Sequence, residues 1–197
     1  YIKFLKYPNV HQVVKYNNFV SEVIGSIVSP GSLVLHNLTL KNDNRKKKIL
    51  GLNPGASYGN SKRWYPKEFA NVAEALSANF DLVIFGGPAD EKIANDIESS
   101  LIKKGIKNYQ NLAGKTSIIE LIDKIANLDL FITGDSGPMH IAAAFQIPTV
   151  AVFGPTKHNE TSQWKNNKSV IVKKNLECQP CMKRTCPLNH HNCMKQI

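Results

Sequence analysis

The chain has 197 residues, of which 42% are hydrophobic and 20% charged, a composition typical of a soluble globular protein. No apolar run approaches the ~18 residues of a transmembrane helix, and the start of the chain does not read as a cleavable signal peptide. Because the chain begins at Tyr1 and not at Met, we expect a fragment or a processed product.

The formal net charge of +10 is concentrated at the two ends of the chain. Residues 1–48 and residues 157–197 each hold eight Lys or Arg against two Asp or Glu, whereas residues 49–156 hold nine against eleven. This asymmetry fits either solvated lysines on the surface or attraction to phosphates, nucleic acid or an anionic membrane.

Short apolar runs alternate with helical patterns along the middle of the chain. After an amphipathic helix around residues 11–24, the patterns predict strands at 49–53, 81–85, 109–112, 129–133 and 148–153, and helices at 66–79, from after 87 to about 104, at 117–126 and at 140–145. Ser117 and Glu120 form a capping box at the start of one of these helices.

Strands that are apolar on both faces and alternate with helices indicate a parallel sheet covered on both sides. The fold class is therefore α/β, a Rossmann-like parallel sheet. In such sheets ligands bind beyond the carboxyl ends of the strands, where this chain has three unusual loops, at 53–64, 86–91 and 133–140.

The loop at 53–64 is rich in glycine and small residues and carries Lys62 next to Arg63. It is not a P-loop, because the sequence Gly-x4-Gly-Lys-[Ser/Thr] is absent. Accessible backbone N–H groups beside a lysine suit a diphosphate, although the same residues fit an exposed turn.

The segment at 86–91 ends in two acidic residues, Asp90 and Glu91. Either carboxylate is able to bind a ribose diol. Both also suit the first turn of a helix, whose dipole favours negative charge there.

The loop at 133–140 contains GDSGPMH, in which Gly-Asp-Ser-Gly also surrounds the nucleophile of trypsin-like proteases. Here the motif lies between an apolar strand and a helix, which instead favours an anion site at the helix N-terminus. Ser136 then donates a hydroxyl, Gly137 allows close approach, Asp135 caps the helix or holds a sugar hydroxyl, and His140 donates to a phosphate.

All four cysteines lie near the C-terminus, at Cys178, Cys181, Cys186 and Cys193, with His190 and His191 between the last two. The Cys-x2-Cys spacing followed by further Cys and His is typical of a structural zinc site. Reduced thiols and two disulfides are the alternatives, and the absence of a secretion signal disfavours disulfides.

Together these segments resemble glycosyltransferase family 9, which includes the lipopolysaccharide heptosyltransferases. The resemblance covers roughly residues 49–194 and depends most on GDSGPMHIAAAFQIPTVAVFGPT, on NPGASYGNSKRW and on the tail CQPCMKRTCPLNHHNCM, which is similar to that of the heptosyltransferase II subset.

This family implies a GT-B architecture, of which the chain would be the C-terminal half. Residues 1–48 would be a linker and remnant of the N-terminal acceptor domain, residues 49–175 the Rossmann-like domain that binds the nucleotide-sugar, and residues 176–197 a Cys/His-rich segment. The catalytic base of the family lies in the N-terminal domain, so the catalytic residue is unknown here, and we expect the fragment to bind ADP but to transfer little.

Carried over by motif, the donor-binding residues would be Lys62 at the diphosphate, Asp135, Ser136, Gly137, Met139 and His140 around the phosphates and the sugar, Thr116 at the adenine, and Glu91 at the ribose. The resemblance implies transfer of heptose from ADP-heptose to the lipopolysaccharide core, with no cofactor needed for transfer. It places the protein in the cytoplasm, peripheral to the inner membrane, without a nucleic-acid partner.

Two other interpretations stay open. One is another GT-B sugar-nucleotide enzyme, such as an epimerase. The other is a basic nucleic-acid-binding module with the Cys/His tail as a zinc knuckle, which the charge asymmetry favours weakly. The tail lacks the aromatic residues expected for stacking on single strands.

Overall fold

The computed structural model describes residues 9–36 and 45–197. In this part of the chain, six strands form one sheet in the order β3-β2-β1-β4-β5-β6, and every neighbouring pair is parallel. The strands are β1 (Lys48–Asn53), β2 (Phe80–Ile84), β3 (Tyr109–Asn111), β4 (Leu130–Gly134), β5 (Thr149–Phe153) and β6 (Ser169–Lys173). The predicted α/β fold with a parallel sheet is confirmed.

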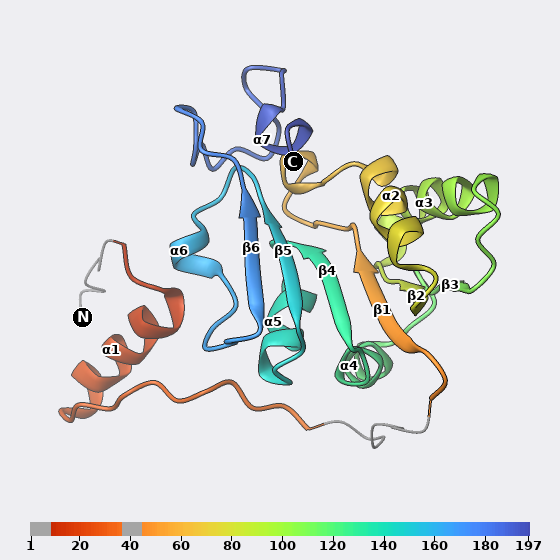
Figure 1. Cartoon of the computed structure of the whole chain (residues 1–197). Helices are drawn as coiled ribbons and strands as arrows, with labels where there is room; N and C mark the ends of the chain where they lie inside the picture. Colours follow the sequence, from red (N-terminus) through yellow and green to blue (C-terminus); the bar gives the residue numbers. More distant parts are fainter. Residues whose placement is uncertain (1–8, 37–44) are drawn as a thin grey trace.

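Helices cover both faces of this sheet (Figure 1). The helices are α1 (Gln12–Ile24), α2 (Pro66–Leu76), α3 (Glu91–Lys103), α4 (Ile118–Ala126), α5 (Gly137–Ala144), α6 (His158–Thr161) and α7 (Asn192–Lys195). Residues of α2, α3 and α7 share one apolar cluster with the strands, and residues of α4 and α5 share a second cluster.

Two predicted helix boundaries were wrong. The helix expected to continue to residue 79 ends at Leu76, because the chain turns through Ser77, whose hydroxyl bonds the carbonyl of Glu74. The helix expected at 140–145 begins three residues earlier, at Gly137, because Ser136 is its extended N-cap and Pro138 suits a first turn.

The amphipathic helix predicted near the start of the chain is α1, and it lies beside α6 at the β6 edge of the sheet (Figure 1). His11 bonds the carbonyl oxygen of Ser162 through Nε2, at 2.9 Å. Lys15 pairs with Glu160, with its Nζ 3.7 Å from Oε2. No helix in the described ranges is long and apolar enough to cross a bilayer.

The carboxyl ends of the strands all lie at one edge of the sheet, beside the C-terminal segment (Figure 1). The loops that follow β1, β2 and β4 therefore meet there, as predicted for a ligand site.

Candidate functional site

A pocket of about 580 Å³ lies where the loops after β1, β2 and β4 meet the start of α4. It is lined by Asn53, Gly55, Ala56, Ser57, Tyr58, Lys62, Gly86, Gly87, Pro88, Asp90, Thr116, Ser117, Ile118, Leu121, Asp135, Ser136, Gly137 and Pro138. Its size is that of a pocket for a small molecule or cofactor. We call it the donor pocket, after the ligand that the family resemblance implies.

Lys62 and Asp135 form an ion pair in the wall of the donor pocket. The distance from Lys62 Nζ to Asp135 Oδ2 is 2.6 Å, and the side chains are only 14% and 6% exposed. The hydroxyl of Thr156 donates to the same carboxylate oxygen at 2.6 Å, and Lys62 Nζ lies 4.8 Å from the centre of the Tyr58 ring. The ion pair therefore holds the ammonium group of Lys62 in place at the surface of the pocket.

A second network holds the hydroxyl of Ser136. Asn53 Nδ2 donates to Thr133 Oγ1 and to Ser136 Oγ, both at 3.1 Å, and the two hydroxyl oxygens lie 3.2 Å apart. These partners set Ser136 at the N-terminus of α5, in an arrangement without the histidine that a serine nucleophile needs. Sequence reasoning missed Asn53, although it ends a strand at the ligand-binding edge.

Gly137 opens α5 and faces the donor pocket. A Cβ atom added there meets no heavy atom within 4 Å, so the glycine is not required by packing against the protein. The N–H of Gly137 therefore remains approachable from the pocket, whereas Pro138 has no N–H and the N–H of Met139 donates to the carbonyl of Ser136.

Two residues of the GDSGPMH motif lie outside the donor pocket. Met139 is fully buried and packs with Ala151 and Phe153, because it lies on the sheet-facing side of α5. His140 is half-buried, and burial lowers the pKa of its imidazole although Asp135 opposes this shift. Burial therefore favours its neutral form, and neither side chain lines the pocket.

Of the two acidic residues after β2, Asp90 lines the donor pocket and Glu91 does not. Arg63 donates to Asp90 Oδ1 at 2.9 Å, and the N–H of Gly87 donates to Oδ2 at 3.2 Å. Glu91 instead lies against Gly114, where an added Cβ would be 2.3 Å from its Oε1. Asp90 is thus the carboxylate placed to meet a ligand.

Thr116 lies at the other end of the donor pocket, next to Ser117 and Ile118 at the start of α4. Ile118 is 70% exposed, whereas Ile125 of the same helix is fully buried. An exposed isoleucine beside Thr116 offers an apolar surface for a flat ring.

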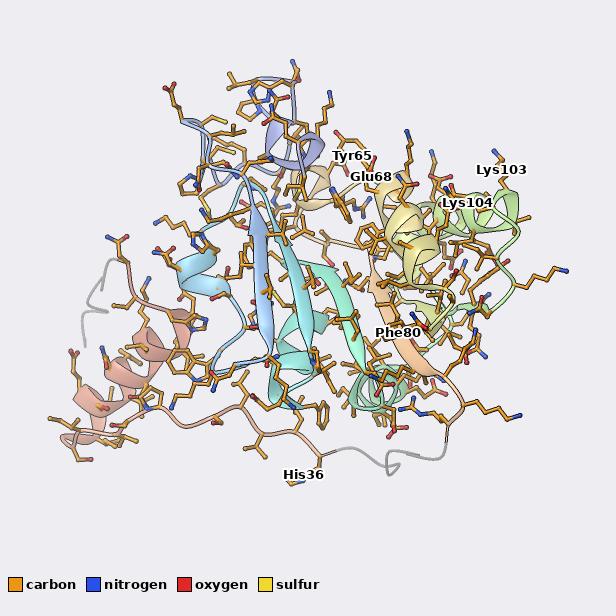
Figure 2. All side chains as sticks on the ribbon, viewed as in Figure 1. His36, Tyr65, Glu68, Phe80, Lys103 and Lys104 are labelled. Carbon is orange, nitrogen blue, oxygen red and sulfur yellow. The ribbon has the colours of Figure 1, made fainter. Side chains whose placement is uncertain are left out.

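The C-terminal segment holds the glycine-rich loop after β1 in place. Tyr58 donates its hydroxyl to the carbonyl of Met182 at 2.7 Å, and the N–H of Ser61 donates to the carbonyl of Arg184 at 3.1 Å. His191 bonds both the hydroxyl of Tyr65, at 2.9 Å, and the carbonyl of Ser61, at 3.0 Å. Figure 2 shows Tyr65 next to this segment. The loop that carries Lys62 is therefore braced.

Replacing Gly59 by alanine is expected to break this bracing. The φ of Gly59 is +155°, and an added Cβ would lie 2.4 Å from the carbonyl oxygen of Arg184. We expect the free energy of unfolding in urea to fall by about 2–3 kcal/mol, from strain and displacement of the tail together.

Gly105→Ala is the matched control, because Gly105 also has a positive φ, of +73°, but an added Cβ there meets nothing within 4 Å. It should cost only the backbone strain, about 1 kcal/mol. Equal losses in the two variants would show that the tail does not brace the loop.

The four cysteines gather around a small cavity of about 20 Å³, with His190 and His191 beside them. Yet no three Cys, His, Asp or Glu side chains in the described ranges are placed to hold one metal ion. His191 is occupied by Tyr65 and Ser61, and His190 Nδ1 accepts the N–H of Asn192. The predicted zinc site at Cys178, Cys181, Cys186 and Cys193 is not supported.

The thiols themselves are free rather than disulfide-bonded. Burial, and then the neighbouring thiols, raise the pKa of Cys193 to about 11. Backbone N–H donors, first among them that of His191, lower the pKa of Cys186. Of the three alternatives drawn from the sequence, the arrangement fits reduced cysteines that pack locally.

The model of glycosyltransferase family 9 (heptosyltransferase) matches residues 11–192. The chain is 46% identical over 200 residues to lipooligosaccharide heptosyltransferase 2 of Campylobacter jejuni serotype O:2, covering 98% of this chain and 61% of that protein. It is 33% identical over 127 residues to lipopolysaccharide heptosyltransferase 2 of Escherichia coli K12, covering 64% and 36%. The chain thus spans about three fifths of the length of the Campylobacter relative.

Solved structures share the fold. A family 9 glycosyltransferase from Veillonella parvula superposes with a TM-score of 0.72 at 23% identity, over 85% of this chain and 50% of that one. The E. coli heptosyltransferase WaaC with ADP superposes with a TM-score of 0.65 at 18% identity, over 85% and 51%.

Proposed function

The chain belongs to glycosyltransferase family 9, and from this premise we propose that it is the donor-binding part of an enzyme that transfers heptose from ADP-heptose to the lipopolysaccharide inner core. The observation that carries the proposal is the donor pocket, in which a fixed lysine, a helix N-terminus and a carboxylate face one cavity. In this proposal residues 1–48 end an acceptor domain, residues 49–175 bind the donor and residues 176–197 brace the site.

The donor pocket suits each part of an ADP-sugar. The diphosphate would lie between Lys62 and the N–H of Gly137 at the start of α5, where both the charge and the helix dipole are favourable. The adenine would lie against Thr116 and Ile118, and the ribose hydroxyls would donate to Asp90. Asp90 thereby replaces Glu91 as our candidate for the ribose.

Inverting transfer needs a base that deprotonates the acceptor hydroxyl and positive charge that stabilises the departing diphosphate. Lys62 and the N-terminus of α5 would supply the charge. We place the base in the N-terminal part of full-length relatives. Neither Met139 nor His140 lines the donor pocket. They would act indirectly, by packing α5 in the position from which its N-terminus meets the phosphates.

The acceptor would be reached at the cytoplasmic face of the inner membrane, through peripheral contact. The excess of Lys and Arg at both ends of the chain supports attraction to anionic lipid. Nucleic acid is not a partner in this proposal.

Titration calorimetry tests the proposal on the chain itself. We expect saturable binding of ADP, weaker binding of UDP, and little heat with single-stranded oligonucleotides at 150 mM salt. Oligonucleotide binding with a steep salt dependence, and no binding of ADP, would instead favour a nucleic-acid module.

Ser136→Ala is expected to weaken ADP binding by about fivefold, because one hydrogen bond to the phosphates is worth about 1 kcal/mol. Calorimetry on the folded variant measures the effect. Ser100→Ala, on the exposed face of α3, should leave the affinity unchanged. An unaltered Kd in Ser136→Ala would mean that Ser136 only caps α5 and does not bind the nucleotide.

A further inference from the structure

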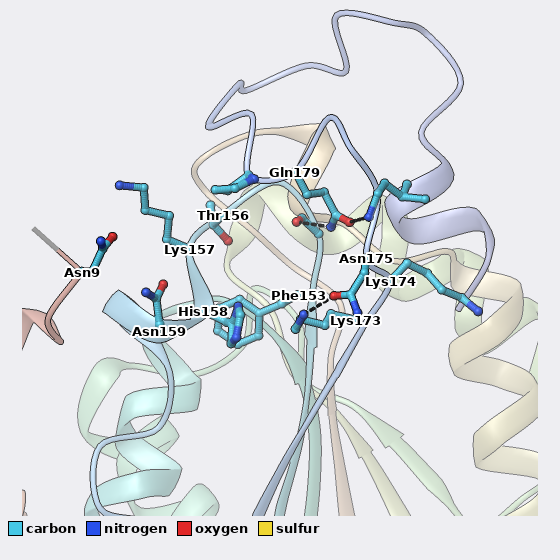
Figure 3. A pocket seen from close by; sticks show the side chains of 13 residues that line it. Asn9, Phe153, Thr156, Lys157, His158, Asn159, Lys173, Lys174, Asn175 and Gln179 are labelled. Atoms are coloured by element: carbon cyan, nitrogen blue, oxygen red, sulfur yellow. Dashed lines mark hydrogen bonds between the residues drawn. The ribbon is translucent and has the colours of Figure 1, made fainter.

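A second pocket, of about 500 Å³, lies at the carboxyl ends of β5 and β6. We call it the basic pocket. It is lined by Asn9, Phe153, Gly154, Thr156, Lys157, His158, Asn159, Lys173, Lys174, Asn175, Leu176, Gln179 and Pro180 (Figure 3). It shares no lining residue with the donor pocket.

The charge of the basic pocket is one-sided. Its lining holds three lysines and a histidine but no aspartate or glutamate. Lys157 pairs with Glu160, its Nζ 2.9 Å from Oε1, so its charge is partly neutralised. Lys173 donates only to the neutral amide of Asn175, and Lys174 has no ion-pair partner within the described ranges. Lys173 therefore stands at the pocket without a counter-charge, whereas the Lys174 side chain points away from Lys173 and His158 (Figure 3).

The floor of the basic pocket is held in place by its own contacts. Gln179 Nε2 donates to the carbonyl of Gly154 at 2.6 Å, and its Oε1 accepts the N–H of Leu176 at 3.1 Å. His158 packs edge-on against the buried ring of Phe153, with ring centres 6.3 Å apart. Figure 3 shows the ring of His158 over that of Phe153, with Lys173 next to them. Burial and then Lys173 lower the pKa of His158.

These features favour an anion that carries oxygen atoms and is attached to a larger group. The uncompensated ammonium group of Lys173 attracts negative charge, and the amides of Asn159 and Asn175 offer hydrogen bonds to its oxygens. A volume of about 500 Å³ exceeds the needs of an isolated phosphate and lies in the range of small-molecule sites.

The basic pocket is linked to the donor pocket by one residue. Thr156 lines the basic pocket, while its hydroxyl donates to Asp135 in the wall of the donor pocket at 2.6 Å. Both pockets open at the same edge of the sheet, because all six strands are parallel. A ligand in the basic pocket thus lies beside the donor.

We propose that the basic pocket binds a phosphate monoester of the saccharide acceptor, through Lys173. This inference rests on the proposed function. If the neighbouring pocket binds the sugar donor, the ligand that must lie beside it is the acceptor, and the basic pocket is placed to bind that acceptor. The group recognised is a phosphate attached to a sugar. Because free phosphate carries a similar charge, the test must distinguish the two ligands.

The test uses the chain with ADP at saturation, so that the donor pocket is filled and its own phosphate affinity is removed. Glucosamine 1-phosphate, inorganic phosphate and uncharged glucosamine are each titrated and followed by amide NMR shifts. We expect the sugar phosphate to shift residues 156–159 and 173–175, to bind more tightly than inorganic phosphate, and glucosamine to shift nothing.

Lys173→Gln should weaken the binding of the sugar phosphate by about fivefold or more. Lys168→Gln is the matched control, because Lys168 is an exposed lysine at the opposite end of β6 and loses the same charge. It should leave the affinity unchanged. Both variants should keep the wild-type affinity for ADP, which shows that they fold.

Four outcomes separate the claims. Equal weakening by Lys168→Gln would reduce the effect to net charge and overturn the inference. Inorganic phosphate could shift residues 156–159 and 173–175 and bind as tightly as the sugar phosphate. This result would assign a site for free phosphate and overturn the acceptor claim. No shifts there, with ADP still bound, would overturn the basic pocket alone. Failure of ADP itself to bind would overturn the proposed function.

Discussion

Replacing Lys62 by methionine is expected to weaken ADP binding by about 30-fold, since contacts from an ionised donor contribute about 1.5–3 kcal/mol. The same change leaves Asp135, only 6% exposed, without its cation. Breaking a buried pair costs about 3–5 kcal/mol, but Lys62 retains some solvent, so we expect the free energy of unfolding to fall by about 2 kcal/mol. Calorimetry with ADP and urea unfolding give the two quantities.

A second variant separates these effects. Asp135→Asn in the Lys62→Met background removes the unpaired charge while the amide oxygen can still accept the Thr156 hydroxyl. Stability should return to within about 1 kcal/mol of the wild type, whereas ADP affinity should stay low. Recovery of both together would mean that Lys62 only supports the fold.

Phe131→Ala is expected to lower the free energy of unfolding by about 3–5 kcal/mol, the usual cost of emptying a buried phenylalanine site. Phe131 lies on β4, is fully buried and meets Phe85 edge-on, with ring centres 6.1 Å apart. Gly51 faces it from β1, where an added Cβ would lie 2.7 Å from the Phe131 ring.

Chemical unfolding measures this loss, with Ile102→Ala as the control. Ile102 is 59% exposed on α3, so its truncation should change stability by less than about 1 kcal/mol. If Phe131→Ala lowered the free energy of unfolding no more than Ile102→Ala, the apolar cluster beneath α4 and α5 would not contribute to the stability of the fold.

The sheet was predictable because its central strands are buried on both faces and read as continuous apolar runs. The capping box at Ser117 also identified the start of α4, where Ser117 Oγ accepts the N–H of Glu120 at 3.2 Å. The strand β6 was missed because it lies at the sheet edge and is half exposed. Its Val170, for example, is 58% exposed, so hydrophobic burial leaves a weaker pattern there.

The place of the donor pocket was predictable from the rule that parallel strands deliver their loops to one edge. That rule brought Lys62, Asp135 and Ser136 together, although they come from loops more than 70 residues apart. The burial of Met139 was not predictable, because it depends on which side of a helix starting at Gly137 faces the sheet.

The choice between Asp90 and Glu91 depends on the short 3₁₀ turn at Pro88–Asp90, which directs neighbouring side chains apart. The bracing of the loop after β1 by the C-terminal segment joins residues over 120 positions apart and leaves no periodic signal. Metal-like spacing of the cysteines was misleading, because spacing does not report how the histidines between them are used.

A crystal structure of the chain soaked with ADP-heptose tests the central claim most directly. We predict diphosphate oxygens within hydrogen-bond distance of Lys62 Nζ and of the N–H of Gly137, with the adenine against Ile118. Nucleotide bound away from both residues 53–64 and residues 133–140 would contradict the assignment of the donor pocket.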